Sequence, residues 1–107
     1  MIRVIVHHVT KSRDDAERLM NVIAQLRNEA IKQPGYITGE TLINTLDPTN
    51  ILVISTWKNG ETWEAWDKSE VRTKITRENM LPLLIKPYEV SQFEFARVQR
   101  GRVVSIT

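Results

Sequence analysis

Two apolar patterns alternate along this chain of 107 residues, and their order limits the folds that it can adopt. Residues 2–9 are rich in β-branched side chains, which is typical of a strand. In residues 16–30, apolar side chains recur at steps of three and four, which predicts one face of a helix. Ser12 resembles the cap that begins such a helix, and Pro34-Gly35 is expected to stop it near Gln33.

The rest of the chain contains three more strand patterns and one more helical region. Residues 36–45 alternate loosely, and residues 51–57 begin with four consecutive aliphatic side chains, which indicates a strand buried on both faces. Residues 61–79 are charged and aromatic at helical spacing, as expected of two short helices that meet near Ser69. Residues 88–98 alternate again. This order predicts an α+β, ferredoxin-like fold (βαββαβ), in which the helices cover one face of a four-stranded antiparallel sheet.

The predicted sheet is apolar on both of its faces. In the first strand, Ile2, Val4 and Val6 point to one face, whereas Ile5 and Val9 point to the other. An exposed apolar patch of this extent is rare on a monomer. A second copy of the chain is the simplest cover for the face that the helices leave open, so we expect a homodimer.

The composition excludes several classes of site. The chain has no Cys, which excludes disulfides, thiolate zinc sites and cysteine nucleophiles, and which fits a reducing compartment. The first residues resemble neither a secretory signal nor a membrane-spanning segment. We therefore expect a cytoplasmic location.

The small basic excess belongs to the C-terminal end. The net charge is +2, and Arg97, Arg100 and Arg102 lie in the last eleven residues with no acidic residue among them. We predict a domain over residues 1–98 and a basic tail over residues 99–107 that contacts the partner subunit. So short a basic run does not indicate nucleic acid, and neither nucleic acid nor a membrane is an expected partner.

Three tryptophans lie within ten residues, in a chain that is only 7% aromatic. Trp63 and Trp66 are three residues apart and share a helix face, and Trp57 lies where the third strand leads into that helix. Each of them is suited to anchor the helix on the sheet. As a set they are instead suited to wall a pocket for a flat aromatic ligand, and the two interpretations stay open.

The two histidines, His7 and His8, are consecutive. Their side chains point to opposite faces of a strand, so they cannot hold one metal ion together, and we predict no metal site. Either imidazole is able to carry a proton or contact a ligand. Arg72 is placed to steer an anion into a cleft, although the acidic residues interleaved around it favour a solvated helix face.

The segment around the tryptophans resembles a known family. Thr56-Trp57-Lys58, residues 61–66 and residues 68–71 are similar to the strand-to-helix signature of the antibiotic biosynthesis monooxygenase superfamily, and most similar to its haem-degrading branch. Pro34-Gly35-Tyr36 resembles the Pro-Gly-Phe with which the second strand of that family begins. The likeness in element order extends over residues 1–98.

The resemblance implies a dimeric α/β barrel in which two subunits pair their sheets, with a pocket in each subunit between the sheet and the second helical region. It implies oxygenation of an aromatic or quinol substrate without flavin or metal or, in the haem-degrading branch, of a bound haem. Trp66 falls on the pocket tryptophan of that branch. The proximal histidine of the branch falls on Ile75 or Thr76, so we prefer the wider family and expect no cofactor, with haem as the alternative.

We therefore predict a small monooxygenase whose aromatic or quinol substrate, once deprotonated, passes an electron to O2. The predicted catalytic residues are His7 or His8 as the base and Trp66 against the ligand. The predicted ligand-binding residues are Trp57, Trp63, Tyr36, Asn44 and Arg72. The alternatives are a haem-binding or haem-degrading monooxygenase, a non-catalytic small-molecule-binding dimeric module, and a structural dimerisation module.

Overall fold

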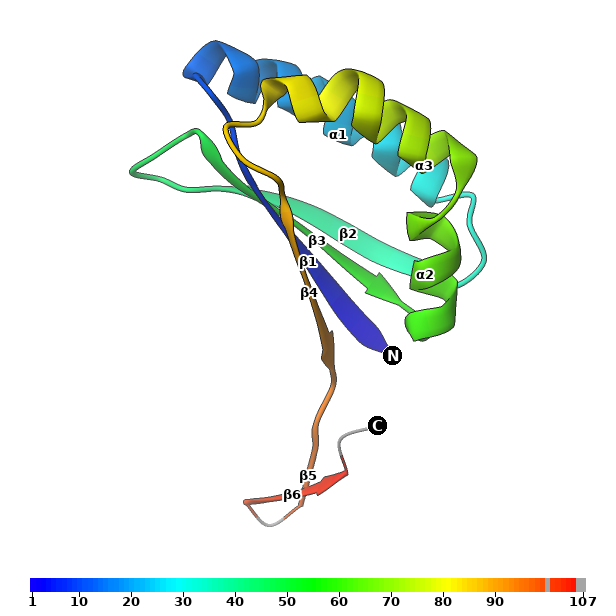
Figure 1. Cartoon of the computed structure of the whole chain (residues 1–107). Coiled ribbons are helices and arrows are strands. Elements are labelled where there is room, and N and C mark those ends of the chain that lie inside the picture. The colour runs from blue at the N-terminus through cyan, green and yellow to red at the C-terminus, as the bar shows by residue number, and fades with distance from the viewer. Residues whose placement is uncertain (100, 106–107) are drawn as a thin grey trace.

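The computed structural model describes residues 1–99 and 101–105, and it places a four-stranded antiparallel sheet under a layer of helices (Figure 1). The strands are β1 (Ile2–Val9), β2 (Tyr36–Ile43), β3 (Asn50–Trp57) and β4 (Glu89–Glu94), in the spatial order β2-β3-β1-β4. The helices are α1 (Arg13–Ala30), α2 (Gly60–Asp67) and α3 (Glu70–Ile75), followed by a π-helical turn η1 (Thr76–Met80) and a 3-10 turn η2 (Leu81–Leu83). The predicted α+β ferredoxin-like fold is confirmed.

Short polar side chains fix where the helices begin. The Ser12 hydroxyl accepts a hydrogen bond from the Asp15 backbone N–H at the start of α1, and Ser69 caps α3 in the same way. Asn59 and Thr62 form a reciprocal capping box at the start of α2. The helix α1 ends at Ala30, earlier than the predicted end near Gln33, because the N–H groups of Lys32 and Gln33 bond three residues back in tighter turns.

The last strand is shorter than predicted. The strand β4 ends at Glu94, and residues 97–99 instead form β5 (Arg97–Gln99), which pairs with β6 (Arg102–Ser105) in a separate hairpin. This hairpin projects away from the sheet (Figure 1). It begins before the predicted boundary at residue 98, and Arg100 lies outside the described residues. The division into domain and tail, and the contact of the tail with a partner, stay predictions.

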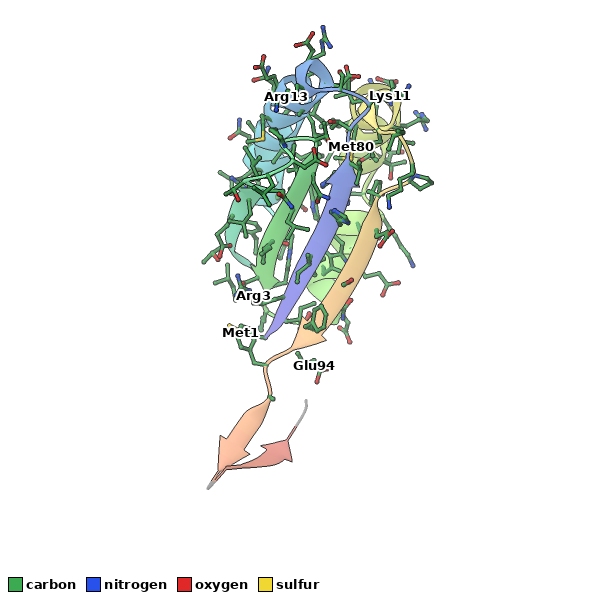
Figure 2. The ribbon with its side chains drawn as sticks, turned by 90° about the vertical axis from the view of Figure 1, so that its left-hand side faces the viewer. Met1, Arg3, Lys11, Arg13, Met80 and Glu94 are labelled. Carbon is green, nitrogen blue, oxygen red and sulfur yellow. The ribbon has the colours of Figure 1, made fainter. Side chains whose placement is uncertain are left out.

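Strand β1 separates the two faces of the sheet by strict alternation. Ile2, Val4, Val6 and His8 are buried against the helices, whereas the residues between them are half-buried on the opposite face. We call this opposite side the open face. In Figure 2, Arg3 and Glu94 lie at the same end of the sheet, as expected from the antiparallel pairing of β1 with β4.

The open face carries apolar side chains. The register of the strands places Ile5, Leu42, Ile54 and Phe93 on it, together with an ion pair between Arg3 and Glu40. The middle of β3 is half-buried rather than buried on both faces, because helices cover only one side. None of the helices in the described part of the chain has the length and apolar character needed to cross a membrane, and the cytoplasmic location stays a prediction.

Gly35 joins α1 to β2 in a backbone conformation that favours glycine. Its φ angle is +86°, and a Cβ at this position would lie 2.5 Å from the Cβ of Thr62 in α2. We expect Gly35→Ala to lower the free energy of unfolding by more than about 1 kcal/mol, measured by urea denaturation.

Gly60→Ala is the matched control for this prediction. A Cβ at Gly60 meets only the end of the flexible Gln92 side chain, at 3.0 Å, so we expect a change within about 0.5 kcal/mol. Equal stabilities of the two variants would contradict the role assigned to Gly35.

Candidate functional site

A small cavity lies between the helix-covered face of the sheet and the helices. Its volume is about 60 Å³. The residues that line it come from both layers. They include Val6, His8, Arg27, Tyr36, Gly39, Val53, Ser55, Trp57, Trp63, Trp66, Arg72 and Met80. Arg27, Tyr36 and Gly39 are half-buried, whereas the histidine, the tryptophans and Arg72 are buried. The cavity therefore has a partly exposed mouth between α1 and β2 and a closed inner end.

The three tryptophans are both core residues and cavity walls. All three are buried, with exposed fractions of 0% for Trp57, 6% for Trp63 and 3% for Trp66. The rings of Trp57 and Trp63 meet edge to face at 5.8 Å between centroids, and Tyr36 meets Trp57 in the same way at 5.3 Å. The indole N–H of Trp57 donates to the Ser55 hydroxyl. Both interpretations of the cluster made from the sequence therefore describe part of the structure.

Arg72 places a positive charge at the inner end of the cavity. Its side chain is 8% exposed, and its Nε donates to Oδ1 of Asp67 at 3.1 Å. The guanidinium carbon lies 5.3 Å from the ring centroid of Trp63 and 6.0 Å from that of Trp66, within the range of cation–π attraction. Two aromatic rings and one carboxylate therefore hold the guanidinium in place, and its Nη2 is buried without a hydrogen-bond partner among the described residues.

His8 lines the cavity as a neutral imidazole. It is 1% exposed, and burial lowers its pKa from 6.5 to about 4, with the positive charge of Arg72 acting in the same direction. Its Nδ1 lies 3.4 Å from the carbonyl oxygen of Ile51, which can only accept, so Nδ1 carries the proton. Nε2 is then an unprotonated acceptor, and it is buried without a partner among the described residues.

His7 and Asn44, predicted as base and ligand donor, are not among the residues that line the cavity. His7 points to the open face, where Nε2 bonds to Oδ1 of Asn50. Asn44 stabilises its own loop, because Oδ1 accepts from the N–H groups of Leu46 and Asp47. The other predicted residues, namely His8, Tyr36, Trp57, Trp63, Trp66 and Arg72, all line the cavity.

Arg27 and Met80 are among the lining residues that were not predicted as site residues from the sequence. Arg27 lies at the mouth and donates from Nη2 to the Thr41 hydroxyl at 2.7 Å. It follows the buried Leu26 and lies one turn after Ile23. Its position at the edge of the buried helix face is the feature of the sequence that indicates a residue at the mouth of a cavity. Met80 ends the π-helical turn, and nothing in its local sequence indicates that irregularity.

The chemistry of the site is that of cations, an imidazole and aromatic rings. Among the described residues that line the cavity, two are Arg and none is Asp or Glu. No group of three His, Cys, Asp or Glu side chains within residues 1–99 and 101–105 has an arrangement that would hold a metal ion. This arrangement is suited to accept a proton at His8 and to stabilise a negative oxygen beside Arg72.

Comparisons with known proteins point to one family. The family model described as antibiotic biosynthesis monooxygenase matches residues 1–77. No curated protein matches the sequence. Among solved structures, SnoaB, a cofactor-independent oxygenase from Streptomyces nogalater, is similar with a TM-score of 0.77 at 12% identity, over 92% of this chain and 96% of that one.

Two other solved structures are similar to the same extent. A conserved protein from Methanosarcina mazei Go1 has a TM-score of 0.78 at 20% identity, over 86% of this chain and 89% of that chain. A structure described as an antibiotic biosynthesis monooxygenase has a TM-score of 0.79 at 13% identity, over 91% of this chain and 100% of that chain. At these identities the likeness establishes the fold.

The lowered pKa of His8 predicts how stability depends on pH. Below pH 6.5 the unfolded chain binds a proton at this residue, whereas the folded chain does so only near pH 4. The free energy of unfolding should therefore fall by about 3 kcal/mol through His8 as the pH drops from 7 to 4. His8→Asn retains a donor for the Ile51 carbonyl and lacks this titration.

Urea denaturation of the two proteins at pH 7, 5.5 and 4 checks this prediction. The hydrogen bonds of Thr49 to Asp47 and of Lys68 to Glu64 lower the pKa of both carboxyl groups, which adds acid sensitivity to wild type and variant alike. The free energy of unfolding of the wild type should therefore fall more steeply toward pH 4 than that of His8→Asn. Curves that stay parallel would contradict a neutral, buried His8.

Proposed function

The chain belongs to the antibiotic biosynthesis monooxygenase family, and from that premise we propose that it oxygenates a small aromatic or quinol substrate without flavin or metal. The observation that carries the proposal is the unpaired Nε2 of His8, a neutral imidazole in the cavity walled by the three tryptophans. A pocket meant only for packing or passive binding has no need of a buried, unpaired base, since such a group costs about 1–3 kcal/mol. His8 therefore favours catalysis over a non-catalytic binding module.

The chemistry begins with a proton transfer to His8. A phenol, or the CH2 group of an anthrone-like ketone, loses a proton to Nε2, and the resulting oxyanion is stabilised by Arg72. The negative charge also reverses the low basicity of His8, because the imidazolium gains a counter-ion when the substrate becomes an anion. The tryptophan rings exclude water around this charge pair.

The remaining steps need only O2. The substrate anion gives one electron to O2, and the carbon radical combines with superoxide to form a C–O bond. The proton held by His8 completes the hydroperoxide. For a CH2 carbon, loss of water from this group breaks the O–O bond and the second C–H bond, leaving a carbonyl, so that one oxygen atom enters the product and the other leaves in water. No external reductant is consumed.

The cavity must widen for a substrate to bind. Its volume of about 60 Å³ is smaller than the roughly 150 Å³ cavity known to take up benzene. Arg27 and Tyr36 at the mouth are half-buried, so we expect these side chains to move when a substrate enters. The aromatic ring then lies between Trp57 and Trp66, with its hydroxyl toward His8.

The side chains around the cavity do not fit haem, the alternative considered from the sequence. The positions that correspond to a proximal ligand are Ile75 and Thr76, which are buried and offer no imidazole. The single histidine that lines the cavity, among the described residues, is His8, which is buried beside the cationic Arg72.

We also propose that two copies of the chain pair through their open faces. The apolar side chains of this face, Ile5, Leu42, Ile54 and Phe93, come from all four strands and lie opposite the helices. Leu42 and Phe93 are 48% and 56% exposed in the single chain. Pairing of two such faces would cover them, as in the dimeric barrel that the family resemblance implies.

Oxygen uptake tests the assignment of the base. With an anthrone-like substrate or a panel of quinols, His8→Asn should lower the rate of O2 consumption by at least 100-fold, since it keeps the contact to Ile51 and removes Nε2. His7→Asn is the matched control on the open face and should retain the rate. Full activity of His8→Asn, or absence of uptake by the wild type with every substrate, would refute the proposal.

Sedimentation equilibrium tests the dimer. Phe93→Glu places a charge on the open face and should convert a dimer to a monomer. Val71→Glu, on the exposed side of α3, should leave the association unchanged. A monomeric wild type at micromolar concentration would contradict the pairing.

A further inference from the structure

Arg72 at the inner end of the cavity and Thr76 on the following helical turn both have unmet hydrogen-bonding capacity among the described residues. Nη2 of Arg72, which lines the cavity, and the hydroxyl of Thr76, which is not among the lining residues, are buried without a partner in the part of the chain that the structure describes. These residues lie one helical turn apart, and the backbone N–H of Thr76 bonds to the carbonyl oxygen of Arg72. Both side chains are therefore on the same side of the helix. Unmet buried donors of this kind indicate a polar ligand group.

The charge around the cavity selects for an anion. Arg72 at the inner end and Arg27 at the mouth both line it, and no carboxylate does among the described lining residues. The ion pair of Arg72 with Asp67 occupies Nε and leaves Nη2 free. Asp67 itself is 39% exposed in its side chain, so solvent weakens its compensation of the buried guanidinium.

Arg72 is also prevented from turning away to find another partner. Its guanidinium lies within 6.0 Å of the Trp66 and Trp63 ring centroids, and its Nε is fixed by Asp67. A guanidinium held in this way is preorganised for an incoming oxygen anion.

We infer that the substrate of this site is an aromatic acid, whose carboxylate binds Nη2 of Arg72 while a neighbouring ring hydroxyl faces His8. The tryptophan walls favour a flat ring. A carboxylate is planar like the guanidinium and the ring, so it fits between flat walls better than a tetrahedral phosphate does. The inference rests on the proposed function in placing the substrate in this cavity, and it adds the acidic group to the substrate class.

Calorimetric titration with 2-hydroxybenzoate and 2-hydroxybenzamide tests the inference. The two compounds share the ring and the hydroxyl and differ in the charge of the second group. We expect the wild type to bind the carboxylate at least tenfold more tightly than the amide, since charge-assisted hydrogen bonds are about twice as strong as neutral ones. Equal affinities, or no detectable binding of either compound at millimolar concentration, would overturn it.

Variants then locate the anion. Arg72→Met should remove the preference for the carboxylate, while Arg77→Met, an exposed cation on the following turn, should retain it. Circular dichroism verifies that each variant is folded. If Arg72→Met does not fold, Arg27→Met decides, because a preference lost in that variant would place the anion at the mouth and overturn the assignment to Arg72.

Binding is measured under argon, without turnover, so the outcome is independent of the oxygenase proposal. A carboxylate preference in a protein that consumes no O2 would keep this inference and refute the proposed function. Oxygen uptake on neutral quinols, together with equal binding of acid and amide, would support the proposed function and refute this inference.

Discussion

The edge-to-face contact between Trp57 and Trp63 joins the two layers of the molecule at the point where the site forms. Trp57 ends β3 and Trp63 lies in α2, so this contact fixes how the helical region begins relative to the sheet. The position of Arg72 depends on it, since its guanidinium lies against Trp63 and Trp66. Loss of the indole at residue 57 would therefore disturb the cation as well as the core, in addition to the roughly 3–5 kcal/mol that removal of a buried tryptophan costs.

The local periodicity of the sequence was sufficient to predict the element order. The alternation of β1, the spacing of α1 and the cap at Ser12 each depend on neighbours within a few residues, and all three are confirmed. The end of β4 was predicted too late, because the residues after Glu94 keep an alternating pattern while they pair with β6 instead of β1. Pairing partners distant in the chain are not encoded in a local pattern.

The site was predictable only in part. Alternation predicts that one of the two histidines faces the helices. Which of the two does so depends on the side of the sheet that the helices cover. The burial of Arg72 was not evident, since Glu70 and Glu78 around it are typical of a solvated face and the aromatic contacts that shelter it come from α2. Asn44 is the opposite case. Its amide oxygen accepts hydrogen bonds within its own loop, and its predicted role depended on its residue type alone.

The cavity and the proposed pairing surface lie on opposite faces of the sheet. The described residues that line the cavity lie on the helix side, whereas the apolar side chains available for pairing lie on the other side of the same strands. Each chain therefore carries the cavity whether or not the open face is covered. For the proposed ligand we therefore expect one binding site per chain in any oligomer built through the open face, and a saturation curve without cooperativity between subunits.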